Sequence, residues 1–164
     1  MQSEVEVIIP GAMHFLRQPE ILLNLVVVTF AWVTSSFGYY LINFQVNDFP
    51  GNATTNNIAF GCTGLIATGT SGWLYLKVGM KVSFFFLFLS SAIGGFLILV
   101  WGYNSDSDMV FSALVLLSAF GVASTFNIVY SSHAATFPTL FSGTAMGICN
   151  FAARVATIFA PTVA

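Results

Sequence analysis

The sequence predicts an all-α membrane protein, and two observations lead to this prediction. Of its 164 residues, 57% are hydrophobic and 6% are charged, whereas soluble domains carry about 25% charged residues. Five apolar stretches also reach the roughly 20 residues that a helix needs to cross a bilayer. We therefore expect a multi-pass chain that contacts the lipid bilayer, in either the plasma membrane or an internal membrane.

The expected spans follow one another with short breaks between them. They cover about 21–43, 56–76, 82–103, 109–131 and 142–164, after a segment of residues 1–20. The loop at 45–55 contains Asp48, Pro50 and Gly51, which are residues typical of turns. The later breaks are a basic turn at 77–81, an acidic turn at 104–108, and residues 132–141, which contain Pro138.

Basic residues predict the orientation, because Lys and Arg near span ends stay on the cytoplasmic side. Arg17 precedes the first span, while Lys77 and Lys81 lie between the second and third spans. Alternation of the spans places all three on one face and Asp48 on the other. We expect residues 1–20 to be a cytoplasmic segment and residues 21–164 to form a partial transmembrane bundle.

Composition and residue spacing also argue against several classes of function. The net charge of −2 and the lack of a basic cluster predict no nucleic-acid partner. Cys62 and Cys149 are isolated in apolar segments, and His14 and His133 are far apart, so we expect no metal and no cofactor. An enzyme is not expected either, since no span holds paired acids or a nucleophile with a base.

Arg154 is the one cation that the topology does not explain. It lies about 12 residues into the fifth span, near 18 Å at 1.5 Å per residue, which is close to the middle of the membrane. A charge at that depth costs at least about 2.5–3.5 kcal/mol, so we expect it to face protein or water.

Polar residues at helical spacing form three stripes. The fifth span has Gly143, Gly147, Asn150, Arg154, Thr157 and Pro161 on one face, the first has Thr29, Trp32, Ser36, Tyr39, Tyr40 and Asn43, and the fourth has Ser124, Asn127 and Ser131. These stripes either bond helices to one another or converge on a cavity. For Ser and Thr we favour bonding between helices, and for Arg154 with Tyr39 and Tyr40 we favour a function. Gly94-Gly95, in the apolar third span, indicates a close helix contact.

Three stretches carry a resemblance to a known family. Residues 15–44 combine Arg17 and Pro19 with a Trp and a Tyr-Tyr pair. Residues 72–81 (GWLYLKVGMK) match an inner-loop signature at Gly72, Lys77, Gly79 and Lys81, and residues 137–161 run from Phe-Pro-Thr through Ala-Arg to Ala-Pro. In this order and spacing, the chain resembles the organic ion transporters of the major facilitator superfamily, which carry organic cations, organic anions and carnitine.

The resemblance implies that the five spans are helices seven to eleven of a twelve-helix transporter, in a C-terminal six-helix bundle. One further span and an N-terminal six-helix half would then be missing, so we expect a fragment. Alternating access around a site near the bilayer midplane is also implied. The alternative is a membrane-protein fragment or partner subunit that does not transport.

The resemblance also suggests a substrate. At the position of Arg154, anion carriers of the family tend to have arginine and cation carriers an acidic residue, so a small organic anion is expected. The predicted substrate-binding residues are Arg154, Tyr39, Tyr40, Trp32, Asn150 and Asn127. Alternatively, Arg154 is a packing clamp whose partners are Asn150 or backbone carbonyls.

The chain departs from the family pattern at three charged positions of the inner gate. Leu76 replaces an aspartate, Ala135 a glutamate and Ser142 an arginine. Loss of all three avoids leaving one unpaired charge, and it predicts that the inward-open state is favoured.

Overall fold

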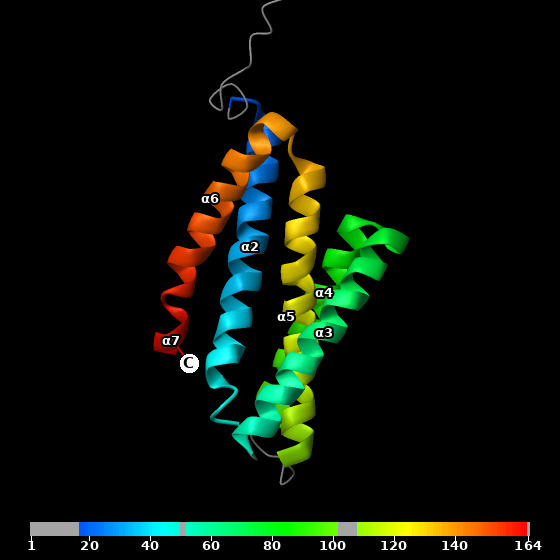
Figure 1. Cartoon of the computed structure of the whole chain (residues 1–164), viewed down its shortest axis with the longest axis vertical. Helices are drawn as coiled ribbons and strands as arrows, with labels where there is room; N and C mark the ends of the chain where they lie inside the picture. The colour runs from blue at the N-terminus through cyan, green and yellow to red at the C-terminus, as the bar shows by residue number, and fades with distance from the viewer. Residues whose placement is uncertain (1–16, 50–51, 102–107, 164) are drawn as a thin grey trace, which may run out of the picture.

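The computed structural model describes residues 17–49, 52–101 and 108–163, and all regular structure in these ranges is helical (Figure 1). The helices are α2 (Pro19–Gln45), α3 (Ala53–Val78), α4 (Met80–Trp101), α5 (Asp108–Thr136), α6 (Thr139–Thr157) and α7 (Ala160–Val163). They overlap the five predicted spans, and their helical structure confirms the all-α class. His14, the predicted segment up to residue 16, the turn residues Pro50 and Gly51, and most of the acidic turn at 104–108 lie outside the described residues.

Local chemistry explains where two of the helices begin. Pro19 occupies the first turn of α2, where the missing N–H of proline would have had no partner in any case. Asn52 caps α3, because its side-chain oxygen accepts a hydrogen bond from the Thr54 backbone N–H at 2.9 Å. These two residues therefore determine where α2 and α3 begin.

The fifth predicted span is interrupted, whereas the sequence analysis treated 142–164 as continuous. α6 ends at Thr157, and the short α7 begins at Ala160. Pro161 explains the break, because a proline ring clashes with the carbonyl four residues earlier, which here belongs to Thr157. The backbone N–H of Ile158 still donates to the Arg154 carbonyl at 3.2 Å. The helix is therefore regular through Arg154.

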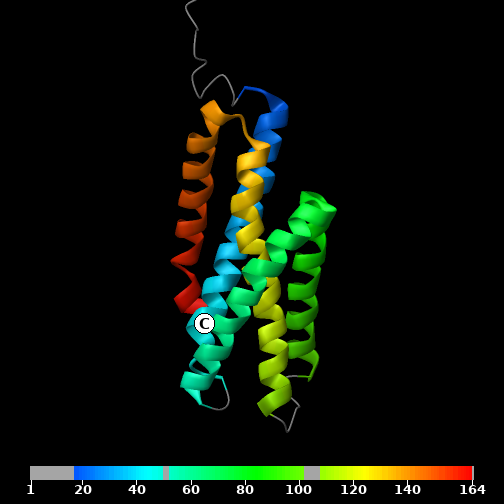
Figure 2. The same ribbon diagram turned by 45° about the vertical axis from the view of Figure 1, so that its right-hand side comes forward.

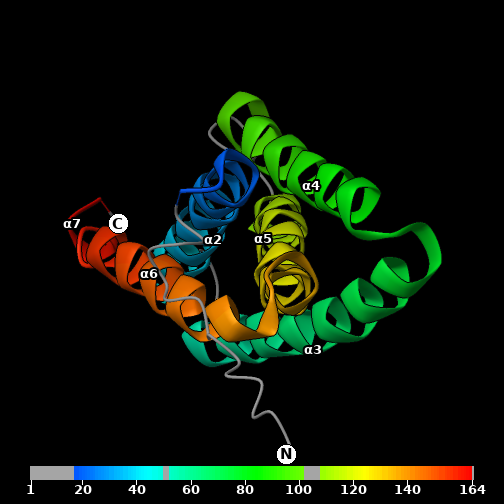
Figure 3. The ribbon, with the colours of Figure 1, turned by 90° about the horizontal axis from the view of Figure 1, so that it is seen from above.

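α5 lies in the middle of the bundle (Figure 3). It packs against α3, α4 and α2, and α3 crosses it obliquely (Figure 2). α6 packs mainly on α2 and touches α5 much less. At the α4–α5 crossing, a Cβ added to Gly94 would lie 2.7 Å from the Ser118 backbone nitrogen, while one added to Gly95 would meet no atom within 4 Å. The predicted close contact therefore belongs to Gly94.

The described helices expose much apolar surface. By length and composition, four helical segments are able to cross a membrane: α2, most of α4, most of α5, and α6 together with α7. α3 falls short of the same hydropathy because it contains many Thr, Asn and Gly residues, so its membrane crossing stays a prediction. Large side chains such as Leu23, Phe30 and Leu99 are exposed, as expected of a surface that faces lipid.

Candidate functional site

α2 and α6 lie side by side, and residues of the predicted polar stripe of α2 bond to α6 (Figure 1). The Thr29 hydroxyl lies 3.2 Å from the Cys149 sulfur, and further along the Ser36 hydroxyl lies 3.3 Å from that of Thr157. Residue numbers rise together at these contacts, so the two helices run parallel. The interhelical bonding expected of Ser and Thr is thus present, and it holds one face of α6 against α2.

Arg154 and Tyr40 meet at the same interface. The guanidinium Nη1 donates a hydrogen bond to the Tyr40 hydroxyl at 3.0 Å, and its Cζ lies 5.7 Å from the centre of the Tyr40 ring. That distance is within the range of a cation–π interaction. Arg154 is otherwise exposed, and its described hydrogen bond uses one of the five N–H donors of a guanidinium. The remaining donors can bind an anion.

Tyr39 extends this pair into an aromatic cluster. Its ring lies 5.7 Å from that of Tyr40 at an interplanar angle of 87°, and it stacks on Phe126 at 5.7 Å and 11°. The ring of Phe60, from α3, lies 5.6 Å from that of Tyr39. Aromatic pairs at such distances are favourable contacts, so α2, α3 and α5 hold these rings in a defined arrangement.

A cavity of about 350 Å³ opens beside this cluster, between α2, α3 and α5. Tyr39, Phe60, Phe126 and Asn127 line it, together with Thr68 and small residues of α3. The Asn127 amide donates to the Thr68 hydroxyl and to the Ala123 carbonyl, each at 3.0 Å. Both N–H groups of the amide are thereby used, and its carbonyl oxygen remains as an acceptor. Aromatic walls with one directed acceptor suit a planar organic molecule.

Two other predicted residues lie apart from this cavity. Trp32 is 1% exposed, and its ring packs on Tyr130 at 4.5 Å and His133 at 5.7 Å. It therefore supports the helices in the present conformation, and its contact with a ligand stays a prediction. Asn150 is half-buried on α6, one turn before Arg154. The described hydrogen bond of Arg154 goes to Tyr40 and not to Asn150, which is one of the partners that the packing alternative named beside backbone carbonyls.

The residues of the inner-loop motif gather at one end of the bundle. Lys77 lies in the last turn of α3 and Lys81 in the first turn of α4, and both are exposed, as is Gly72 one and a half turns before Lys77. Gly79 separates the helices with φ +83° and ψ 171°, a conformation that only glycine adopts readily. The Lys-x-Gly-x-Lys spacing thus makes a tight turn that presents two cations together.

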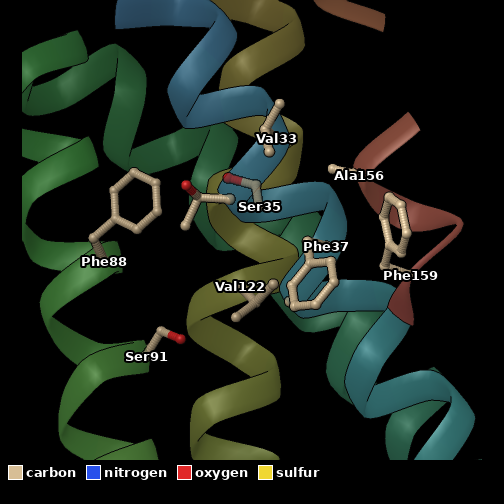
Figure 4. Close-up of a pocket in the computed structure, with 10 residues that line it drawn as sticks. Val33, Ser35, Phe37, Phe88, Ser91, Val122, Ala156 and Phe159 are labelled. Carbon is tan, nitrogen blue, oxygen red and sulfur yellow. The ribbon is translucent and has the colours of Figure 1, made fainter. Parts of the chain in front are cut away.

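A larger cavity of about 520 Å³ lies between α2, α4, α5 and the C-terminal end of α6 (Figure 4). Its lining is mainly apolar and includes Phe37, Phe88, Val122 and Phe159. The Ser35 hydroxyl at its edge is bonded to the Ala31 carbonyl of its own helix. No charged side chain lines this cavity, in contrast to the surface around Arg154.

Sequence reasoning missed Phe60, Phe126 and Thr68. Phe126 adjoins Asn127 in the predicted stripe of the fourth span, so its position was a usable signal. Nothing in the sequence distinguished Phe60 from the other phenylalanines, of which the chain has 18 in total. Among the described residues, no three His, Cys, Asp or Glu side chains lie close enough together to hold a metal ion.

Comparison with known families gives one match over nearly the whole chain. The family described as Major Facilitator Superfamily matches residues 3–161. This match and the similar proteins below agree with the resemblance that the three sequence stretches indicated.

Individual relatives point to the same group. The chain is 30% identical over 136 residues to "Solute carrier family 22 member 4" of Mus musculus, covering 83% of this chain and 24% of that protein. It is 26% identical over 154 residues to "Solute carrier family 22 member 13" of Homo sapiens, covering 93% and 27%. Against "Organic anion transporter 3" of Rattus norvegicus the identity is 26% over 136 residues, covering 83% and 25%. The chain thus spans about a quarter of the length of these relatives.

Proposed function

Because the chain belongs to the Major Facilitator Superfamily, we propose that it is part of a transmembrane solute carrier that moves a small organic anion by alternating access. The observation that carries the anion assignment is the contact between Arg154 and Tyr40, with Nη1 3.0 Å from the hydroxyl. No carboxylate among the described side chains bonds this cation. A membrane-embedded charge without a counterion favours an anionic ligand.

Arginine suits a carboxylate in particular. Its planar guanidinium can donate two parallel hydrogen bonds to the two carboxylate oxygens. Tyr40 supports this arrangement, because its hydroxyl accepts from Nη1 and so restrains the side chain. The substrate we propose therefore carries a carboxylate or a similar planar anionic group.

The neighbouring cavity would take the rest of the molecule. Its volume of about 350 Å³ falls within the usual range of small-molecule sites, about 300–1,000 Å³. Tyr39, Phe60 and Phe126 would pack against an apolar or aromatic body, and the Asn127 oxygen would accept from a donor on the ligand. Since the chain covers about a quarter of its relatives, other parts of the full-length protein would complete the site.

We also propose that the N-terminal end of α2 faces the cytoplasm. Arg17 precedes α2, and the turn with Lys77 and Lys81 lies at the same end of the bundle (Figure 1). Asp48 follows α2 at the opposite end. This distribution follows the positive-inside rule.

The experiment that tests the anion assignment is uptake by the full-length protein that contains these residues. Labelled aromatic carboxylates and organic cations of similar size would be compared in cells or proteoliposomes, with Arg154→Gln beside the parent protein. We expect uptake of the carboxylates and its loss in Arg154→Gln at equal protein level. Uptake of cations in place of anions, or full anion uptake by Arg154→Gln, would overturn the proposal.

A further inference from the structure

His133 lies in the last turn of α5 and contacts the start of α6. Its Nε2 lies 2.9 Å from the Ser142 carbonyl oxygen, in the first turn of α6. We propose that His133 is a positioning residue for the anion site. By donating to this carbonyl it sets the rotation of α6, and thereby brings Arg154 to Tyr40. The proposal rests on the function proposed above as far as transport is concerned, but its structural part stands independently.

The chemistry of the contact fixes the tautomer. A carbonyl oxygen accepts hydrogen bonds and cannot donate them, so the proton of the neutral ring lies on Nε2. Nδ1 then carries a lone pair. The His133 side chain is 3% exposed, and Nδ1 is buried without a partner among the described residues.

The unpaired nitrogen indicates that His133 does more than fill space. Its ring packs against Trp32 at 5.7 Å and Phe137 at 4.9 Å, where an apolar side chain would fit without leaving a buried acceptor unpaired. An unpaired buried acceptor destabilises the fold. What the imidazole supplies, and a hydrocarbon cannot, is the hydrogen bond to Ser142.

The packing of α6 explains why one hydrogen bond at its start has an effect further along. After Phe141, the face of α6 buried in the bundle consists of small residues, Ala145, Cys149 and Ala153. Small side chains let α6 approach its neighbours closely, but they provide few interdigitating atoms to fix its rotation. The rotation is then set by the hydrogen bonds at its edges, of which the one from His133 is the first.

A modest rotation of α6 would be enough to disturb the site. Side chains reach about 5–6 Å from a helix axis, so a turn of about 20° moves their ends by about 2 Å. The contact between Nη1 and the Tyr40 hydroxyl, now 3.0 Å, would be lost by such a movement. Arg154 lies twelve residues after Ser142, along one continuous helix that transmits the rotation.

Two amide variants in the full-length protein test the proposal. His133→Gln can place its amide nitrogen near the present Nε2, whereas His133→Asn places it nearer to Nδ1 and loses the bond to Ser142. The first readout needs no transport. With the other cysteines replaced, Ser36→Cys and Thr157→Cys should form a disulfide, since the native hydroxyls are 3.3 Å apart, and its rate of formation reports the rotation of α6.

We expect His133→Gln to cross-link like the parent and His133→Asn to cross-link more slowly. In uptake assays without the cysteine pair, KM for a carboxylate should rise about tenfold in His133→Asn and return to near the parent value in His133→Gln. Equal behaviour of the two variants in both assays would overturn the proposal, because a residue that only fills space would not distinguish them. If the His133→Asn protein does not accumulate in the membrane, His133→Leu replaces it, because leucine also has no N–H to donate to the Ser142 carbonyl.

Arg154→Gln separates this proposal from the function on which it rests. If that variant keeps its anion uptake, the anion assignment fails, while slower cross-linking in His133→Asn still supports the positioning role. If Arg154→Gln loses uptake but the two His133 variants cross-link and transport alike, the anion site stands and the positioning role is overturned.

Discussion

The hydroxyl of Tyr40 lies 3.0 Å from Nη1 of Arg154, and the ring of the same tyrosine faces the guanidinium at 5.7 Å. Tyr40 therefore contacts the cation in two ways, through a hydrogen bond and through the ring face. Its neighbour Tyr39 belongs to the aromatic cavity. The Tyr-Tyr pair thus links the charged part of the site to the apolar part.

Tyr40→Phe separates the two contacts, because it removes the hydroxyl and keeps the ring. A hydrogen bond to a charged group contributes about 1.5–3 kcal/mol. We therefore expect KM for a carboxylate substrate to rise at least about tenfold at unchanged protein level. Initial rates of uptake by the full-length protein, measured over a range of substrate concentrations, give this value.

Tyr75→Phe is the matched control for that variant. Tyr75 is a half-buried tyrosine near the end of α3, away from Arg154. Its hydroxyl is not part of the site, so its removal should leave KM unchanged. An unchanged KM in Tyr40→Phe would show that the Arg154–Tyr40 hydrogen bond has no role in binding.

Phe60→Ala is predicted to affect large substrates more than small ones. The Phe60 ring forms one wall of the cavity of about 350 Å³, and an aromatic contact contributes about 0.5–1.5 kcal/mol beyond area burial. KM for an aromatic carboxylate should rise about three- to tenfold, while KM for a short aliphatic carboxylate changes little. Competition between the two substrates in one uptake assay measures the difference.

The control for Phe60 is Phe96→Ala on α4. Phe96 is exposed and lines none of the cavities described above, so neither substrate should be affected. A parallel rise in KM for both substrates in Phe60→Ala would indicate a general distortion of α3 in place of a lost wall.

The helices and their polar stripes were open to sequence reasoning, because both depend on local periodicity. Thr29, Ser36 and Tyr40 were placed on one face of the first span, and in the structure all three contact α6. The break before α7 was also readable, since Pro161 excludes a regular helix through Thr157. Local rules therefore account for most of the architecture.

The pairing between distant segments was not readable in the same way. The contacts of Arg154 with Tyr40 and of Asn127 with Thr68 join residues 114 and 59 positions apart. Which stripes meet depends on how the whole bundle packs, and a single sequence does not record that. For the same reason the sequence did not show that the packing of α5 against α2 buries Trp32, whose contact with a ligand stays a prediction.

The proposed orientation leads to a labelling prediction. The exposed Cys62, and any reactive cysteine in other parts of the full-length protein, are first replaced by alanine. Asp48→Cys should then react with a membrane-impermeant maleimide on intact cells. Lys77→Cys should react only after permeabilisation, because we propose that the basic turn faces the cytoplasm. Both positions are exposed, so access decides the result. The reverse pattern would invert the orientation.

The α4–α5 crossing gives a matched pair of glycine substitutions. A Cβ at Gly121 would lie 2.5 Å from the Ser91 backbone nitrogen and 2.8 Å from the Leu87 carbonyl oxygen, whereas a Cβ at Gly95 would meet nothing within 4 Å. Gly121→Ala therefore forces α4 and α5 apart, and overpacking of this kind costs about 1–3 kcal/mol. Gly95→Ala, in contrast, should be neutral or stabilising by up to about 1 kcal/mol, because alanine favours a helix.

The melting temperatures of the purified variants in detergent measure this pair. Gly121→Ala should melt below the parent protein, and Gly95→Ala at or above it. Both substitutions add one methyl group to a helix of the same bundle, so helix propensity alone would shift both temperatures upward. A difference in sign therefore reports the distance between the two backbones, and equal shifts would mean that α4 and α5 do not approach as closely at Gly121 as the structure shows.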